Sequence, residues 1–150
     1  MLVTEDISDV ELKQRWRLYW SHCIFEFSNT KLQSMAWIEG SDAAWPRDEV
    51  WASSFEECFS AYFDTLALDD AYVKAVKAGN VTQEEANRAH DFHMLALLYD
   101  EPDDNPDMIL NDPEWMQVVQ SAKEFWNYLK ATVTSQREID LMEKLENDFD

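Results

Sequence analysis

Glycine is scarce in this chain, and its scarcity narrows the possible folds more than any other feature. Only two glycines, Gly40 and Gly79, and four prolines occur among the 150 residues. Hairpin turns, bulges and phosphate-cradling loops need residues that readily adopt positive φ, so the sequence can build few of them. The composition therefore favours helices. It also excludes the glycine-rich phosphate-binding motifs and the Gly-x-Ser-x-Gly nucleophile elbow.

Apolar residues and capping signals predict where those helices lie. Three segments, Ser8–Glu11, Thr82–Glu85 and Ser135–Glu138, have the Ser/Thr-x-x-Glu pattern of a capping box, and Asp112 followed by Pro113 is a typical helix start. Apolar residues recur after each signal at steps of three and four. We expect longer helices over about 9–27, 48–66, 83–99, 112–131 and 136–149, and short ones over 31–39 and 69–78. Residues 1–150 are thus predicted to form an all-α, single-domain helical bundle of about five longer helices plus one or two short ones.

Two of the predicted helices carry long aromatic stripes that we expect to face the core. Each stripe also contains one cysteine, so buried free thiols are favoured over a disulfide. The stripes are Leu12, Trp16, Tyr19, Trp20, Cys23 and Phe27 in the first helix, and Trp51, Phe55, Cys58, Phe59, Tyr62 and Leu66 in the second.

The charge balance predicts a class of partner. Asp and Glu number 31 against 12 Lys and Arg, a formal net charge of −19, yet 46% of the residues are hydrophobic. Such a chain is expected to fold with its acidic residues outside, where they would attract a basic protein. Nucleic-acid phosphates and anionic lipid headgroups would be repelled, so we expect neither direct nucleic-acid binding nor membrane binding. Residues 1–6 lack the basic-then-apolar pattern of a signal peptide, and a cytoplasmic protein is expected.

The negative charge is concentrated in residues 89–122, which contain no Lys or Arg. We predict that seven acids here form a partner-binding surface, the acidic ridge, which would pair with Lys and Arg of the partner. A solvated face without a partner is the alternative interpretation. The ridge consists of Asp100, Glu101, Asp103, Asp104, Asp107, Asp112 and Glu114.

In size and composition the chain resembles the small acidic immunity proteins with which bacteria neutralise their own toxins, including those of contact-dependent growth inhibition. The resemblance is one of type and includes no shared motif. The Tyr-Tyr pair of the colicin-nuclease immunity group is absent, because none of the five tyrosines is adjacent to another. The resemblance implies a protein that occludes the active or substrate-binding surface of a basic toxin, expected to be a nuclease.

The same residues allow other functions. A nucleic-acid mimic would use the same charge against a DNA-binding enzyme, and an adaptor would use it only for solubility. A metal-binding helical protein could be built on His90 and His93, with Asp91 or Asp100 and the more distant His22, Cys23 or Cys58 as further ligands. The spacing favours histidines at the edge of the core instead.

Residues 103–114 also match part of a twelve-residue calcium loop. Asp103, Asn105, Asp107 and Glu114 fall at ligand positions, but Met108 replaces the glycine of the sharp turn. We therefore expect no metal site and no cofactor. Because no serine or cysteine has a recognisable activating context, we also expect no enzymatic activity.

Overall fold

Helices are the only regular elements in the computed structural model, which describes residues 8–46, 50–102 and 105–150. The prediction of an all-α fold is confirmed for these ranges. The α-helices are α1 (Asp9–Ser28), α2 (Thr30–Ser34), α3 (Phe55–Ser60), α4 (Val73–Ala78), α5 (Gln83–Leu98), α6 (Pro106–Leu110), α7 (Pro113–Thr132) and α8 (Gln136–Asp148). Two π-helical turns, η1 (Met35–Glu39) and η4 (Ala61–Thr65), prolong α2 and α3, and a 3₁₀ turn, η2 (Gly40–Asp42), follows η1.

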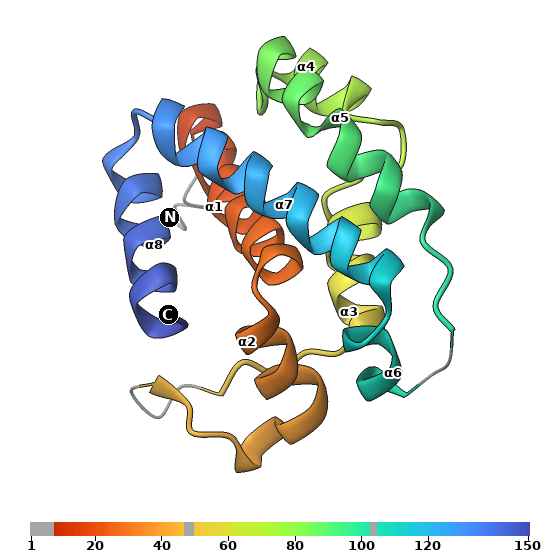
Figure 1. Cartoon of the computed structure of the whole chain (residues 1–150). Coiled ribbons are helices and arrows are strands. Elements are labelled where there is room, and N and C mark those ends of the chain that lie inside the picture. The colour runs from red at the N-terminus through yellow and green to blue at the C-terminus, as the bar shows by residue number, and fades with distance from the viewer. Residues whose placement is uncertain (1–7, 47–49, 103–104) are drawn as a thin grey trace, which may run out of the picture.

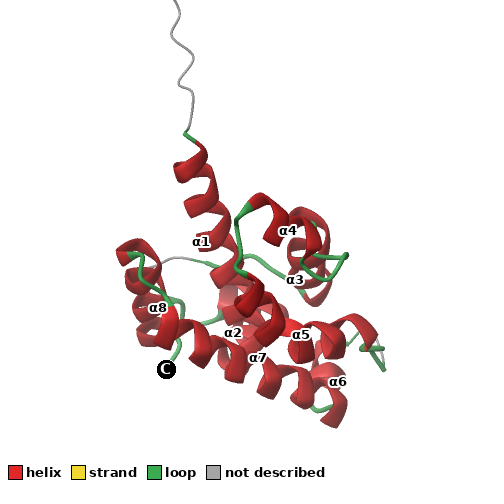
Figure 2. Cartoon of the chain, turned by 90° about the horizontal axis from the view of Figure 1, so that it is seen from above, coloured by secondary structure: helices red, strands yellow, loops and turns green. Residues whose placement is uncertain are grey.

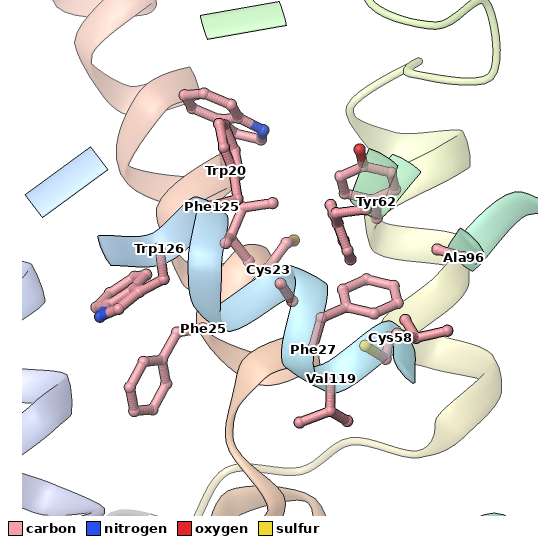
Figure 3. Close-up of a cluster of buried hydrophobic side chains, with 14 of the residues drawn as sticks. Trp20, Cys23, Phe25, Phe27, Cys58, Tyr62, Ala96, Val119, Phe125 and Trp126 are labelled. Carbon is pink, nitrogen blue, oxygen red and sulfur yellow. The ribbon is translucent and has the colours of Figure 1, made fainter. Parts of the chain in front are cut away.

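Helix α1 is the centre of the bundle. It packs along α7 and also contacts α8, α2 and α3, while α5 packs on another side of α7 (Figure 1). One connected cluster of buried side chains fills the space between these helices. Figure 3 shows part of it, including Phe27 of α1 and Tyr62 of η4, whose ring centroids lie 5.4 Å apart.

The helix starts follow the predicted capping signals. Thr82 and Glu85 form a complete capping box, with the side chain of each residue accepting a hydrogen bond from the backbone of the other. Ser8 and Ser135 also accept from the backbone three residues later, and Asp112 caps α7 ahead of Pro113. Gly40 and Gly79 both have positive φ, +60° and +80°, where their helical segments end.

The stripe predicted on α1 is buried only in part. Leu12 is 51% exposed and Tyr19 44%, although both belong to the predicted core stripe; Trp20, Cys23 and Phe27 of the same stripe are buried as predicted. Figure 2 shows the N-terminal turns of α1 projecting beyond the other helices. A helical stripe is buried only along the length that has neighbours, so the stripe alone overestimated the core.

The helix predicted over 48–66 begins later. Residues 50–54 are not helical, and α3 starts at Phe55 with the Ser54 hydroxyl accepting from the Glu57 amide at 3.1 Å. Asp48 lies outside the described residues. Trp51 therefore does not extend the helical stripe, but packs against His22 of α1 with ring centroids 4.3 Å apart.

Two shorter segments also differ. No helix was predicted between residues 99 and 112, but Pro106 begins the five-residue helix α6, a position where proline needs no amide partner. The short helix predicted over 69–78 starts at Val73, and the Asp70 side chain accepts a hydrogen bond from the Lys74 backbone amide. Within the described ranges, no helix combines the length and the apolar character needed to cross a membrane.

Candidate functional site

The acids of the predicted ridge lie at the end of α5, in α6 and at the start of α7. Asp100 and Glu101 follow α5, whereas Asp107 and Glu114 lie in the first turns of α6 and α7. Glu101 is partly buried and the other three are exposed. The remaining ridge residues predicted next to them, Asp103 and Asp104, are outside the described residues.

Asp112, the seventh acid of the ridge, accepts hydrogen bonds from other residues of the same chain. Its Oδ1 accepts from the Glu114 amide at 3.1 Å, and its Oδ2 accepts from the Tyr99 hydroxyl at 2.7 Å. Burial and the neighbouring Asp112 carboxylate raise the pKa of Tyr99, so the phenol stays protonated and donates. Asp112 thus joins the end of α5 to the start of α7.

Helices α5 and α7 lie side by side and run in opposite directions (Figure 1). Tyr99 meets Asp112 at one end of the pair, and at the other the Arg88 guanidinium lies 5.0 Å from the Tyr128 ring centroid. Between these contacts lies an open groove of about 840 Å³, the α5–α7 groove. It is lined by Asp91, Met94, Leu95, Leu98, Tyr99, Glu114, Gln117, Gln120, Ser121 and Glu124.

The α5–α7 groove combines apolar surface with uncompensated negative charge. Leu95 is 37% exposed and Leu98 is 73% exposed. The three carboxylates of the groove are Asp91, Glu114 and Glu124, and the described residues that line it include no Lys or Arg. Within the described part of the chain, none of the three carboxylates forms an ion pair.

A second groove, of about 390 Å³, lies beside the first and brings distant acids together. It lies between α3–η4 and the segment after α5, so that Glu56 and Asp64 face the same space as Asp100 and Glu101. Tyr99 lines both grooves, and its ring packs 5.1 Å from that of Trp115. Trp115 itself is fully buried in the core.

The two histidines of α5 lie in different environments. His90 is exposed, whereas His93 is 1% exposed, with its Nδ1 2.9 Å from the Tyr62 hydroxyl. The Tyr62 hydroxyl lies 2.6 Å from that of Tyr72, which accepts from Trp20 Nε1 at 3.1 Å. Burial lowers the pKa of His93, so this imidazole is a neutral member of a buried hydrogen-bond chain.

No metal site is assembled from the described residues. The structure brings together no group of three or more His, Cys, Asp or Glu that could hold an ion among them. In the calcium-like segment, the middle is occupied by α6, and Asn105 Oδ1 accepts from the Asp107 amide as the cap of that helix. Such a helical turn differs from the open loop that surrounds calcium in an EF-hand.

Sequence reasoning identified the acids of this surface but missed its apolar residues. The run from Met94 to Leu98 contains four large apolar residues in five, more than the buried face of α5 can use. This excess of apolar residues was the feature of the sequence that could have predicted an exposed apolar surface on α5. By fold and site, the chain is an all-α protein with an acidic, partly apolar groove. No protein-family model, curated protein or solved structure matches it.

Proposed function

We propose that this chain is an immunity protein, which binds a basic toxin through its acidic surface and blocks the active or substrate-binding surface of that toxin. The observation that supports this function is the α5–α7 groove, where three carboxylates surround exposed leucines and form no ion pair with any residue that the structure describes. Carboxylates that form no ion pair within the molecule can pair with the cations of another protein. Exposed apolar surface adds affinity that does not depend on salt.

A nuclease is the class of toxin that fits this chemistry best. Enzymes that cleave nucleic acids bind phosphates with Lys and Arg, and the same cations pair well with carboxylates. A net charge of −19 would also steer such a protein toward this surface before contact. Binding would occlude the toxin without altering it chemically.

Neutralisation by co-expression tests the proposal. The probe is the product of the gene directly upstream of the gene of this chain, which we expect to be a basic protein, produced from a separately induced plasmid. We expect growth to stop when the probe is expressed alone and to resume when this chain is co-expressed. Purified together, the two proteins should associate tightly at low salt and much more weakly in molar sodium chloride. Unchanged growth arrest, or binding that is indifferent to salt, would contradict the proposal.

The nucleic-acid mimic remains the second interpretation of the same charge. A mimic presents negative charge to any protein that binds phosphates, so it would inhibit several unrelated DNA-binding enzymes. An immunity protein should inhibit one. A panel of unrelated nucleases and polymerases, assayed with and without this chain, therefore separates the two functions.

A further inference from the structure

We infer that the α5–α7 groove binds a cationic amphipathic helix of the partner. The apolar side chains of that helix pack against Leu95 and Leu98, and its Lys or Arg residues pair with the surrounding carboxylates. This inference rests on the proposed function and deepens it, because it names the element of the basic partner that is recognised.

The walls of the groove are two continuous helix faces. On α5, Asp91, Leu95 and Leu98 are separated by four and three residues and therefore lie on one face. That face is distinct from the buried face, which includes Ala89, Phe92 and Ala96. On α7, the lining residues Glu114, Gln117, Ser121 and Glu124 follow the same helical steps. A groove between two packed helices can accept a third helix, whose side chains pack between those of the first two.

The apolar part of the groove lies along α5. Leu95 and Leu98 are 37% and 73% exposed, and Met94 beside them is partly buried. From Asp91 to Leu98 the helix rises about 10 Å, or two turns. A partner helix with apolar residues at i, i+3 or i+4, and i+7 would cover this length. Burying one leucine side chain stabilises a complex by about 1.5–3 kcal/mol.

The carboxylates stand at both ends of this apolar surface. Asp91 and Glu124 lie toward the end marked by Arg88 and Tyr128, and Glu114 lies beside Tyr99 at the other end. A helix in the groove would therefore meet negative charge at each end of its apolar stripe. Lys or Arg on either side of that stripe is the complementary pattern.

The same features disfavour other occupants. A second copy of this chain would bring another net charge of −19 to a groove that has no Lys or Arg in its lining. Nucleic acid would be repelled for the same reason. An extended strand needs free backbone N–H and C=O groups to pair with, whereas helices α5 and α7 use theirs internally.

The binding test uses a synthetic three-turn helical peptide with leucine at i, i+4 and i+7 and lysine at the flanking positions. One control peptide keeps the leucines and replaces lysine by glutamate. A second keeps the lysines and replaces leucine by serine. Titration into the labelled full chain, followed by amide chemical shifts and calorimetry, should show saturable binding of the first peptide only, with shifts confined to α5 and α7. Equal binding of the serine peptide would overturn the inference, because charge alone would then explain it.

Matched variants locate the site. Leu95→Ala and Leu98→Ala should each weaken peptide binding about tenfold. Leu12→Ala and Val73→Ala, which remove exposed apolar side chains on α1 and α4, should leave it unchanged. A thermal melt of each variant checks that folding is preserved.

The charge variants are matched in the same way. The double variant Asp91→Lys/Glu124→Lys should weaken binding at low salt by at least about tenfold. Its control, Glu39→Lys/Glu143→Lys, changes the net charge by the same amount at exposed acids that do not line the groove. Equal losses in the two doubles would show that net charge, and not the groove, governs binding.

The same variants distinguish failure of the inference from failure of the proposed function. If the groove variants still neutralise the basic toxin, the groove is not the contact surface, although the immunity function stands. If the peptide binds as expected but no toxin is neutralised, the groove is a helix-binding site and the proposed function is wrong.

Discussion

Arg17 of α1 and Glu85 of α5 form a two-pronged ion pair, in which the Arg17 Nη1 and Nη2 donate to Glu85 Oε1 and Oε2 at 2.9 and 2.8 Å. Arg17 Nε also donates to Glu138 of α8, at 2.9 Å. Glu85 and Glu138 are only 7% and 4% exposed. Burial alone would raise the pKa of Glu85, but the hydrogen bonds from Arg17 and Thr82 outweigh it and hold that pKa below its ordinary value. One cation therefore connects three helices.

Replacing this cation should destabilise the bundle strongly. Arg17→Ala would leave two buried carboxylates without their counter-ion, and we expect a loss of about 3–5 kcal/mol in the free energy of unfolding, measured with urea. Arg15→Ala is the control, since Arg15 forms an exposed ion pair with Glu11 and should cost no more than about 0.5 kcal/mol. Similar losses in the two variants would contradict a special role for Arg17.

Glu26 is buried and should oppose folding when ionised. Its Oε2 accepts from Trp37 Nε1 at 2.9 Å and from the Ser53 hydroxyl at 2.7 Å, yet burial raises its pKa. The Glu26 carboxyl therefore loses its proton at a lower pH in the unfolded chain than in the folded protein. The protonated carboxyl stabilises the fold at low pH, and this stability is lost as the pH rises through the folded-state pKa.

Glu26→Gln tests this effect. Glutamine keeps an acceptor oxygen and carries no charge, so the variant should unfold at higher urea concentration than the wild type at pH 7. The difference should shrink as the pH falls toward the ordinary pKa of glutamate. Glu143→Gln, at an exposed site, should show no such dependence. A less stable Glu26→Gln protein at pH 7 would mean that the carboxylate is needed in its ionised form.

His22 should make the protein sensitive to mild acid. Burial lowers the pKa of His22 from 6.5 to about 4, with Lys144 adding to the effect. Between these values the unfolded chain binds a proton that the folded chain does not, so stability present above pH 6.5 is lost as the pH falls toward 4.

His22→Phe keeps an aromatic ring beside Trp51 but cannot titrate. Between pH 6.5 and 4 the wild type should lose about 2–3 kcal/mol more of its unfolding free energy than this variant. Because His93 titrates in both proteins, the difference isolates His22. Parallel stability curves, measured by urea unfolding at each pH, would contradict the prediction.

The two thiols should be unreactive in the folded protein. Cys23 and Cys58 are free and only 6% and 1% exposed, and both lie in the core shown in Figure 3. Burial raises the pKa of both thiols, and the thiolate is the reactive form. A thiol-specific reagent such as dithiobis(nitrobenzoate) should modify neither cysteine under native conditions and both in guanidinium chloride. Rapid modification of either residue in the native state would show that the core opens locally.

Capping signals show how far local sequence predicts this structure. Ser8, Thr82, Asp112 and Ser135 all cap helices as predicted, because a cap depends on residues only two or three positions away. The glutamates three residues later do not all complete their boxes. Glu138 pairs instead with Arg17, 121 residues away in sequence, and no local pattern could reveal that partner.

Burial was predicted less well for the same reason. The stripe on α1 correctly predicts Trp20 and Phe27 in the core, but Leu12 belongs to the stripe and remains exposed. Arg17 was assigned no role from the sequence, although it forms ion pairs with both Glu85 and Glu138. Whether a side chain on a helix face is buried depends on which other helix lies against it.

The sequence alone determined that this chain is helical, where most of its helices start, and that it carries a large excess of acid outside an aromatic core. These properties follow from glycine content, apolar spacing and composition, which act locally or on the chain as a whole. Only the tertiary structure decided which acids share a surface and which leucines remain exposed between them. The antiparallel packing of α5 against α7, and the approach of Glu56 and Asp64 to Asp100, depend on contacts between distant segments, whose geometry no local pattern encodes.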